Sequence, residues 1–287
     1  MALVRPGHQN LLVIGVVTDS AAGLPSDAAA RLDVEVVPLY LLAGGRSLRD
    51  GELPDLYERL EREPGSVTTS TPSPGDFEEA FAGRPEEEVV CVTLAATVSG
   101  VHGAASLAAG MSPKRVDVVD SGSASMGEGW VALAAARAAA AGAPLEEVAA
   151  AARAAAASTR LVATIDTMEH LRRSGRVGWI AALVATGLQL KPVFAMARGE
   201  IAPVARPRTR RRALDRVAAE AIGDLEGGRA RVAALHARAE EDARDLLDRV
   251  RGRVEIVEEH LVEFTAVMGA HTGPGVVGLA YHPEAPA

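Results

Sequence analysis

Five hydroxyl side chains stand together in the segment TTSTPS, residues 68–73, directly before a segment with helical spacing. The start of a helix carries unpaired backbone N–H groups and the positive end of the helix dipole, which both favour a negative charge. Neutral hydroxyls add further hydrogen-bond donors without adding a cation. The segment therefore suits a carboxylate or another small anion. The alternative is a solvated loop that caps the helix, which is a common role of Ser and Thr.

Other polar loops follow apolar runs, at points where strands are expected to end. In open α/β sheets, ligands bind in the crevice beyond the carboxyl ends of the strands. We therefore expect these loops to converge on one site, with the loop around His271 reaching in from the second half of the chain. The loops are TDS (18–20), TVSG (97–100), VDSGSASMG (119–127) and AHTGPG (270–275).

Several other kinds of site are absent from the sequence. Cys91 is the only cysteine, so no disulfide can form within the chain, and no His, Asp or Glu cluster has metal-ligand spacing. Neither a phosphate-binding GxxxxGK[ST] loop nor a GxGxxG motif after the first apolar run is present. The net charge of −8, the pI of about 5.5 and an aromatic content of 3% argue against a nucleic-acid partner. We expect no cofactor and no metal.

A serine hydrolase is the alternative enzymatic reading. Ser99 or Ser121 would be the nucleophile, with His271 as the base. The GxSxG nucleophile elbow is missing, however, because Thr97 stands where that motif has its first glycine.

The apolar runs alternate with helical segments, which predicts an α/β fold. The runs at 11–17, 88–95 and 115–121 are typical of strands buried on both faces, and residues 34–42 are expected to form one strand. A second set of elements begins near Leu161 and includes a hairpin. We predict two α/β domains: residues 1–160 with a mostly parallel sheet and flanking helices, and residues 161–287 with a mixed sheet.

The N-terminal segment is not typical of a signal peptide, because only about seven apolar residues follow Arg5, Pro6 and His8. No stretch of about 18 apolar residues free of charges and turn signals is present. These observations predict a cytoplasmic protein.

Taken in order, the motifs resemble those of the DegV family over roughly residues 13–280. They are TDSAAGLP, TSTPSPGDF, TVSGVHGAA, VDSGSASMG, MEHLRRSGRVG, LKPVF and HTGPGVVGL. The resemblance implies two α/β domains that hold a long-chain fatty acid, such as palmitate, stearate or oleate. It implies a lipid-binding protein rather than an enzyme. It also implies a partner, a fatty acid kinase related to dihydroxyacetone kinase, which converts the presented acid to an acyl phosphate for phospholipid synthesis. Transient contact with a membrane is compatible with this role.

The same resemblance implies which residues hold the carboxylate: Thr69, Ser70, Thr71, Ser99, Gly100 and His271. His271 would orient a threonine hydroxyl. The family usually has Gln in place of Thr71, and Ala96 and Val101 replace polar residues here.

A separate group of arginines is expected to serve the partner rather than the lipid: Arg173, Arg176, Arg208 and Arg211, together with Arg210 and Arg212. An arginine at the head group would hold the carboxylate in a tight ion pair and shield it from the kinase. The segment 206–216 carries six arginines in eleven residues, so a nucleic-acid patch and a solvated face are the alternatives.

Overall fold

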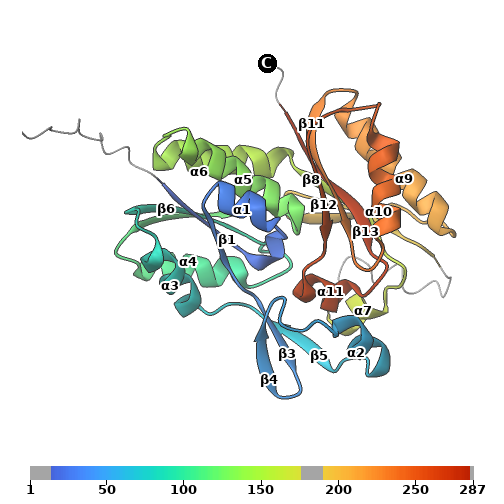
Figure 1. Ribbon diagram of the computed structural model, residues 1–287, viewed down its shortest axis with the longest axis horizontal. Helices are drawn as coiled ribbons and strands as arrows, with labels where there is room; N and C mark the ends of the chain where they lie inside the picture. Colours follow the sequence, from blue (N-terminus) through green and yellow to red (C-terminus); the bar gives the residue numbers. More distant parts are fainter. Residues whose placement is uncertain (1–13, 176–189, 285–287) are drawn as a thin grey trace, which may run out of the picture.

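A computed structural model of the 287-residue chain describes residues 14–175 and 190–284. The described residues form three sheets with helices packed against them (Figure 1). The chain is α/β, as predicted from the alternation of apolar runs and helical segments.

The first sheet is parallel and has the strand order β2-β1-β6-β7. All five residues of β1 are buried, in keeping with a strand covered on both faces. Two helices pack on one face and two on the other (Figure 1). The predicted parallel sheet with flanking helices is confirmed. Its strands are β1 (Gly15–Asp19), β2 (Val34–Val37), β6 (Glu88–Thr93) and β7 (Arg115–Asp120), and its helices are α3 (Pro74–Gly83), α4 (Val101–Met111), α5 (Met126–Ala140) and α6 (Leu145–Ser158).

A small antiparallel sheet corrects one prediction. Residues 34–42 do not form one strand, because they divide into β2 of the first sheet and β3 (Tyr40–Ala43) of a separate sheet with the order β4-β3-β5. Pro38 lies between the two strands, and proline has no N–H group to donate to a ladder. The other strands are β4 (Arg46–Arg49) and β5 (Val67–Ser70), and the β3–β4 hairpin projects from the molecule (Figure 1).

The third sheet is mixed and has the order β10-β9-β8-β13-β11-β12, as predicted for the second half of the chain. Only β11 and β12 are parallel neighbours. Its strands are β8 (Arg160–Thr164), β9 (Val193–Ala197), β10 (Glu200–Ala205), β11 (Arg229–His236), β12 (Glu255–Glu263) and β13 (Val277–Pro283). The boundary between residues 160 and 161 stays a prediction; β8 begins at Arg160.

Helix α5 packs between the parallel and the mixed sheets. It contacts β1 and β6 of the first sheet and β13 and β11 of the third. Eight consecutive residues, 126–133, are buried, as expected for a helix covered on all sides. Trp130 donates a hydrogen bond from Nε1 to the carbonyl oxygen of Ala280, at 3.1 Å. The helix therefore couples the two sheets.

The remaining helices complete the description. α9 (Arg210–Leu225) and α10 (Glu240–Val250) cover the outer face of the mixed sheet. α11 (Ala266–Thr272), which the sequence did not predict, packs against α2, α7, β3 and β5 (Figure 1). The others are η1 (Ser20–Ala22), α1 (Ser26–Arg31), α2 (Leu56–Arg62) and α7 (Glu169–Arg173). Across residues 14–175 and 190–284, no helix combines the length and the apolar character that crossing a membrane requires.

Candidate functional site

A cavity of about 360 Å³ lies where the three sheets meet α11. Its size falls within the range of small-molecule sites. One group of its lining residues is polar: Thr69, Ser70, Thr71, Ser99, His271 and Thr272. The other group is apolar and comes from both halves of the chain: Leu39, Leu94, Val98, Ala124, Leu161, Ala163, Leu171, Phe194, Met196, Ile201, Phe264, Val267, Met268 and Val276. The cavity thus offers hydroxyl groups beside a much larger apolar surface.

The polar part is built around Thr69 and His271. Thr69 Oγ1 lies 2.9 Å from His271 Nε2, a hydrogen-bonding distance, and both side chains are half-buried. Thr69 stands on β5 opposite Leu41, which is fully buried. The strand pairing therefore fixes the threonine, and the contact with His271 fixes its hydroxyl.

An aspartate from the β4 end of the hairpin holds the helix that carries His271. Asp50 accepts hydrogen bonds from the backbone N–H of Val267, at 3.0 Å, and from Ser20 Oγ, at 2.7 Å. Thr265, at the N-cap position of α11, makes no capping hydrogen bond with its own side chain. Asp50 satisfies one of the unpaired N–H groups at the start of α11 in its place.

Ser99 and Gly100 lie at the start of α4. The hydroxyl oxygen of Ser99 accepts a long hydrogen bond, 3.4 Å, from the backbone N–H of Val101. Gly100 does not line the cavity, but a Cβ atom placed on it would lie 3.9 Å from Thr71 Cγ2. The TTSTPS and TVSG segments are therefore neighbours in space.

Part of the hydroxyl-rich segment has the simpler role of a helix cap. Ser73 and Asp76 form a reciprocal capping box at the start of α3. Burial opposes ionisation of Asp76, but hydrogen bonds from Ser73 and from Tyr40 Oη, at 2.7 Å, outweigh burial and lower the pKa of Asp76. This carboxylate already occupies the start of α3, whereas the start of α4, where Ser99 lines the cavity, has no acidic side chain in its first turn.

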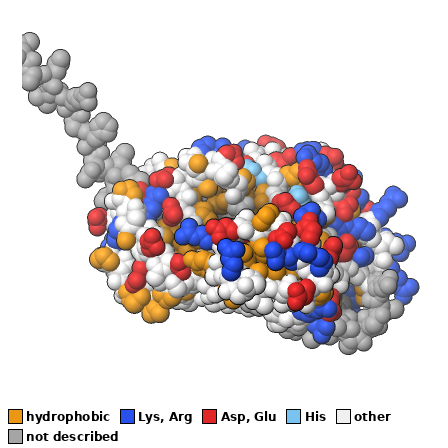
Figure 2. All heavy atoms as spheres, turned by 60° about the horizontal axis from the view of Figure 1, so that its bottom comes forward, with side chains coloured by type: hydrophobic (Ala, Val, Ile, Leu, Met, Phe, Trp, Pro, Cys, Tyr) orange, Lys and Arg blue, Asp and Glu red, His pale blue; other side chains and the backbone are white. Residues whose placement is uncertain are grey.

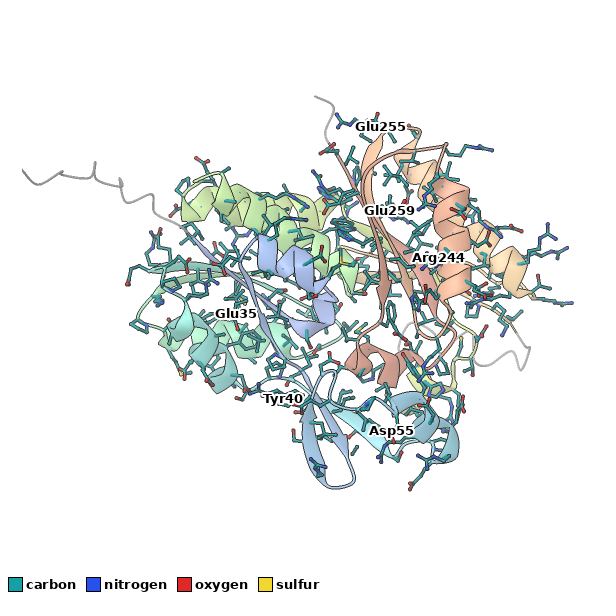
Figure 3. All side chains as sticks on the ribbon, in the orientation of Figure 1. Glu35, Tyr40, Asp55, Arg244, Glu255 and Glu259 are labelled. Atoms are coloured by element: carbon teal, nitrogen blue, oxygen red, sulfur yellow. The ribbon has the colours of Figure 1, made fainter. Side chains whose placement is uncertain are left out.

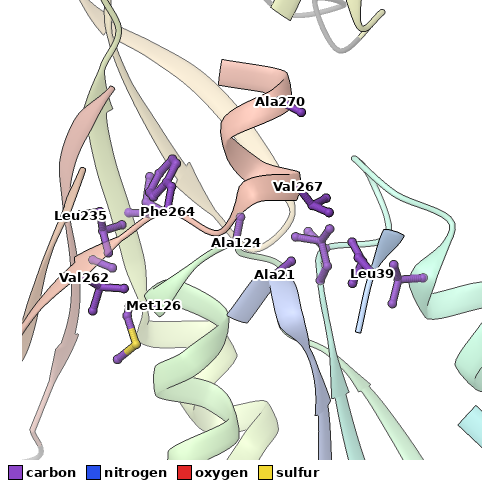
Figure 4. Close-up of a cluster of buried hydrophobic side chains, with 14 of the residues drawn as sticks. Ala21, Leu39, Ala124, Met126, Leu235, Val262, Phe264, Val267 and Ala270 are labelled. Atoms are coloured by element: carbon purple, nitrogen blue, oxygen red, sulfur yellow. The ribbon is translucent and has the colours of Figure 1, made fainter. Parts of the chain in front are cut away.

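The apolar part of the cavity is continuous with a hydrophobic core. Figure 4 shows Leu39, Ala124, Phe264 and Val267, which come from three separate segments of the chain, within one cluster of buried side chains. Each of these residues also lines the cavity. A ligand with a long apolar part would therefore be surrounded by residues from both halves of the chain. None of the described residues that line the cavity is Lys or Arg.

Five of the six candidate head-group residues line this cavity, and Gly100 lies beside it. Their individual roles remain predictions. Ser121, the alternative nucleophile, is fully buried and donates to the carbonyl oxygen of Ser123. Sequence reasoning missed the lining residues of α11, Val267 and Met268, because that helix has only seven residues.

Four of the candidate partner-binding arginines are exposed: Arg173, Arg208, Arg211 and Arg212. Arg173 forms an ion pair with Glu169 at 2.8 Å. Arg176 lies outside the described residues. Arg210, by contrast, is held within the chain. Its guanidinium contacts Asp242 at 2.7 Å and donates to the carbonyl oxygen of Gly275 at 2.6 Å. These contacts within the chain account for the position of the Arg210 side chain, so a partner protein is not needed to explain it.

A larger groove of about 1220 Å³ lies at the carboxyl ends of β11 and β12 and has different chemistry. Arg210, Arg238 and Arg244 line it together with five acidic residues: Asp166, Glu240, Glu241, Asp242 and Glu263. Arg244 projects from α10 and pairs with Glu240 (Figure 3). Basic and acidic side chains also alternate over the face shown in Figure 2. The hydroxyl groups of the smaller cavity do not reach this groove.

Comparison with known proteins places the chain in one family. A family model described as "Uncharacterised protein, DegV family" matches residues 13–284. A DegV domain-containing protein of Streptomyces coelicolor is 38% identical over 273 residues, which cover 93% of this chain and 97% of the relative.

Solved structures agree with that match. A DegV family protein from Thermus thermophilus, described as fatty-acid binding, superposes with a TM-score of 0.89 at 32% identity and covers 94% of this chain and 99% of its own. A stearic-acid-binding protein from Eubacterium ventriosum has a TM-score of 0.81 at 26% identity, with coverage of 94% and 98%. With the family match over nearly its whole length and the same α/β fold as these structures, this chain belongs to the DegV family.

Proposed function

We propose that the protein binds one long-chain fatty acid, with the acyl chain in the apolar part of the cavity and the carboxylate at the hydroxyl groups. The observation that carries this proposal is a single cavity with hydroxyl donors beside an apolar lining from both halves of the chain. The fatty-acid-binding relatives from Thermus thermophilus and Eubacterium ventriosum support it.

The energetics of such a ligand are consistent with its two parts. A sixteen-carbon acid has about fourteen methylene groups, and burial of each contributes ~0.8 kcal/mol, or about 11 kcal/mol in all. Association itself costs about 4–15 kcal/mol, so the tail alone gives only moderate affinity. A buried carboxylate without partners would cancel that gain. The hydroxyls of Thr69 and Ser99 and the N–H groups at the start of α4 offset the cost.

The absence of Lys and Arg among the described lining residues bears on what happens to the bound acid. Neutral donors hold a carboxylate less tightly than a bidentate arginine does. They leave a carboxylate oxygen free to react. We therefore extend the proposal to a protein that presents its fatty acid to a separate kinase related to dihydroxyacetone kinase, for acyl-phosphate formation, and that performs no chemistry itself.

The experiment compares a long-chain fatty acid with its methyl ester. Delipidated protein is titrated with each ligand by calorimetry. The ester keeps the tail but carries no negative charge, so it should bind at least about tenfold more weakly. Equal affinities would remove the hydroxyl groups from the head-group site, and hydrolysis of the ester would favour the serine hydrolase alternative.

A further inference from the structure

Glu128 is a carboxyl group with no contact to water. It lies in the first turn of α5, in the part of that helix enclosed by both sheets, and it is 0% exposed. Its Oε1 accepts a hydrogen bond from Thr18 Oγ1 at 3.1 Å, within the parallel sheet. A buried carboxyl group is stable only when its hydrogen-bond partners match its protonation state, either protonated or charged.

A second buried carboxyl group lies against it. Asp19, at the end of β1, is also 0% exposed. Its Oδ1 accepts from the backbone N–H of Ala21 and its Oδ2 from that of Leu94, both at 2.9 Å. The carboxyl groups of Asp19 and Glu128 face each other within hydrogen-bonding reach, and Glu128 Oε2 is buried with no other hydrogen-bond partner among the described residues. Two carboxyl groups can share a hydrogen bond only if one of them carries a proton.

The surroundings indicate which group carries that proton. Burial raises the pKa of Glu128 well above its ordinary value and raises that of Asp19 to about 6. The other titratable groups that face the pair are acids: Cys91 on β6, Asp120 at the end of β7 and Asp50 after β4. Asp19 receives two backbone N–H bonds, which suit a carboxylate. Glu128 is therefore the protonated donor and Asp19 the charged acceptor.

The pair is connected to the candidate head-group site through Leu94. Leu94 follows β6 and begins the Ser99 loop, residues 94–100, and its side chain lines the cavity. Asp19 holds the first N–H of this loop, and Asp120 accepts from the N–H of Ala96 at 3.3 Å. Two aspartates thus fix the path that the loop takes from the sheet to Ser99.

We propose that Glu128 is a positioning residue for the bound fatty acid: its protonated carboxyl group donates to Asp19 and thereby holds the Leu94 end of the loop that carries Ser99. The inference rests on the proposed function. Loss of this proton would place two negative charges in one buried site, and their repulsion would displace Asp19 from Leu94. The head-group site would then lose the fixed start of its loop.

Two substitutions test the proposal. Glu128→Gln keeps the size of the side chain and a donor for Asp19 but has no acidic proton. Glu128→Leu has a similar size and no donor. Glu147→Gln, on an exposed turn of α6, is the matched control. Three measurements are made at neutral pH: the infrared band of a protonated carboxylic acid, amide hydrogen exchange of residues 94–96, and affinity for a long-chain fatty acid.

We expect the acid band in the wild type and in Glu147→Gln but not in Glu128→Gln. Exchange and affinity should be unchanged in Glu128→Gln, whereas Glu128→Leu should exchange faster and bind about tenfold or more weakly. The infrared comparison needs only the wild type and the glutamine variants, so it decides the protonation state even if Glu128→Leu does not fold.

An acid band that persists in Glu128→Gln would overturn the proposal, as would wild-type exchange and affinity in a folded Glu128→Leu protein. Infrared and exchange are read without lipid. If both behave as expected but the wild type takes up no fatty acid, the proposed function fails, and with it the assignment of Glu128 to a lipid site.

Discussion

Thr69 and His271 are 202 residues apart in the chain, yet Thr69 Oγ1 and His271 Nε2 lie 2.9 Å apart. The threonine comes from the small antiparallel sheet and the histidine from α11, which packs against that sheet. His271 Nε2 takes up one hydrogen-bonding position of the Thr69 hydroxyl group. The other hydrogen-bonding positions of this hydroxyl point away from the histidine. The geometry of the candidate head-group site therefore depends on how the two halves of the chain pack against each other.

Thr69→Val should weaken fatty-acid binding while the protein stays folded. The variant keeps the shape of the side chain and loses the hydroxyl. One hydrogen bond to a charged group contributes about 1.5–3 kcal/mol, so the dissociation constant should rise about tenfold to a hundredfold. Thr68→Val, on the adjacent, exposed position of β5, is the control and should bind normally. Equal affinities of both variants, measured by calorimetry, would exclude Thr69 from the site.

Ser99→Ala should also raise the dissociation constant for the fatty acid about tenfold to a hundredfold, because it too removes a hydrogen bond to the carboxylate. The variant removes a hydroxyl at the start of α4, where the N–H groups also favour an anion. The melting temperature should change little, since Ser99 makes only a 3.4 Å hydrogen bond to the Val101 N–H. Ser106→Ala, on an exposed position of α4, serves as the comparison. An unchanged dissociation constant in the folded variant contradicts the assignment.

The parallel sheet and the mixed sheet could be predicted from the sequence, and so could the convergence of three of the five polar loops. TDS (18–20) contributes no residue to the cavity lining, and VDSGSASMG contributes only Ala124. Continuous apolar runs mark buried strands, and the edge where parallel strands end is a regular place for ligands. The TVSG segment follows this rule, because it comes after β6 of the parallel sheet. Thr69 stands on β5 of the antiparallel sheet and His271 on α11, so the rule does not explain how those two residues reach the cavity.

What could not be predicted depends on contacts between distant residues. α11 is a seven-residue helix whose N-terminal N–H of Val267 is satisfied by Asp50, 217 residues earlier in the chain. No local pattern marks such a helix. The burial of Glu128 has a similar origin, because α5 is enclosed by two sheets and its sequence shows no face for solvent. Ser73, by contrast, could be predicted as a helix cap from the local sequence alone, because Ser is a preferred N-cap residue.

Protonation of His282 should lower stability in mildly acidic solution. Burial, and then the nearby Arg231 and Arg137, lower its pKa from 6.5 to about 4. Between these values the unfolded chain binds more protons than the folded one. The free energy of unfolding should therefore fall, by about 1–3 kcal/mol, as the pH drops from 6.5 towards 4. Denaturant unfolding at several pH values checks this.

His282→Gln is the matched variant, since glutamine retains hydrogen-bonding capacity towards Ser158 and Thr159 but does not titrate. Its stability should depend less steeply on pH between 6.5 and 4 than that of the wild type. Identical slopes for the two proteins would show that another group is responsible.

Arg211→Glu should separate lipid binding from partner binding. Arg211 is exposed at the start of α9 and does not line the cavity that contains Thr69 and Ser99. Charge reversal should leave lipid affinity unchanged but reduce acyl-phosphate formation with a kinase related to dihydroxyacetone kinase. It should also make that reaction less sensitive to salt.

The control for this variant is Arg253→Glu, in the exposed turn between α10 and β12. It makes the same change in net charge at a different surface and should not affect the kinase reaction. If both reversals act equally, net charge rather than a docking surface explains the effect. If Arg211→Glu abolishes lipid binding in a folded protein, the arginine belongs to the lipid site.

The most direct test of the account is the lipid content of the protein itself. Native mass spectrometry of the purified chain, followed by denaturation and extraction, measures the mass and the amount of any bound ligand. We predict one fatty acid of about sixteen to eighteen carbons per chain, a tail long enough for burial to offset the cost of association. Delipidated protein should take up the same acid with the same stoichiometry. A chain that carries no acyl ligand and takes none up after delipidation would contradict the central claim.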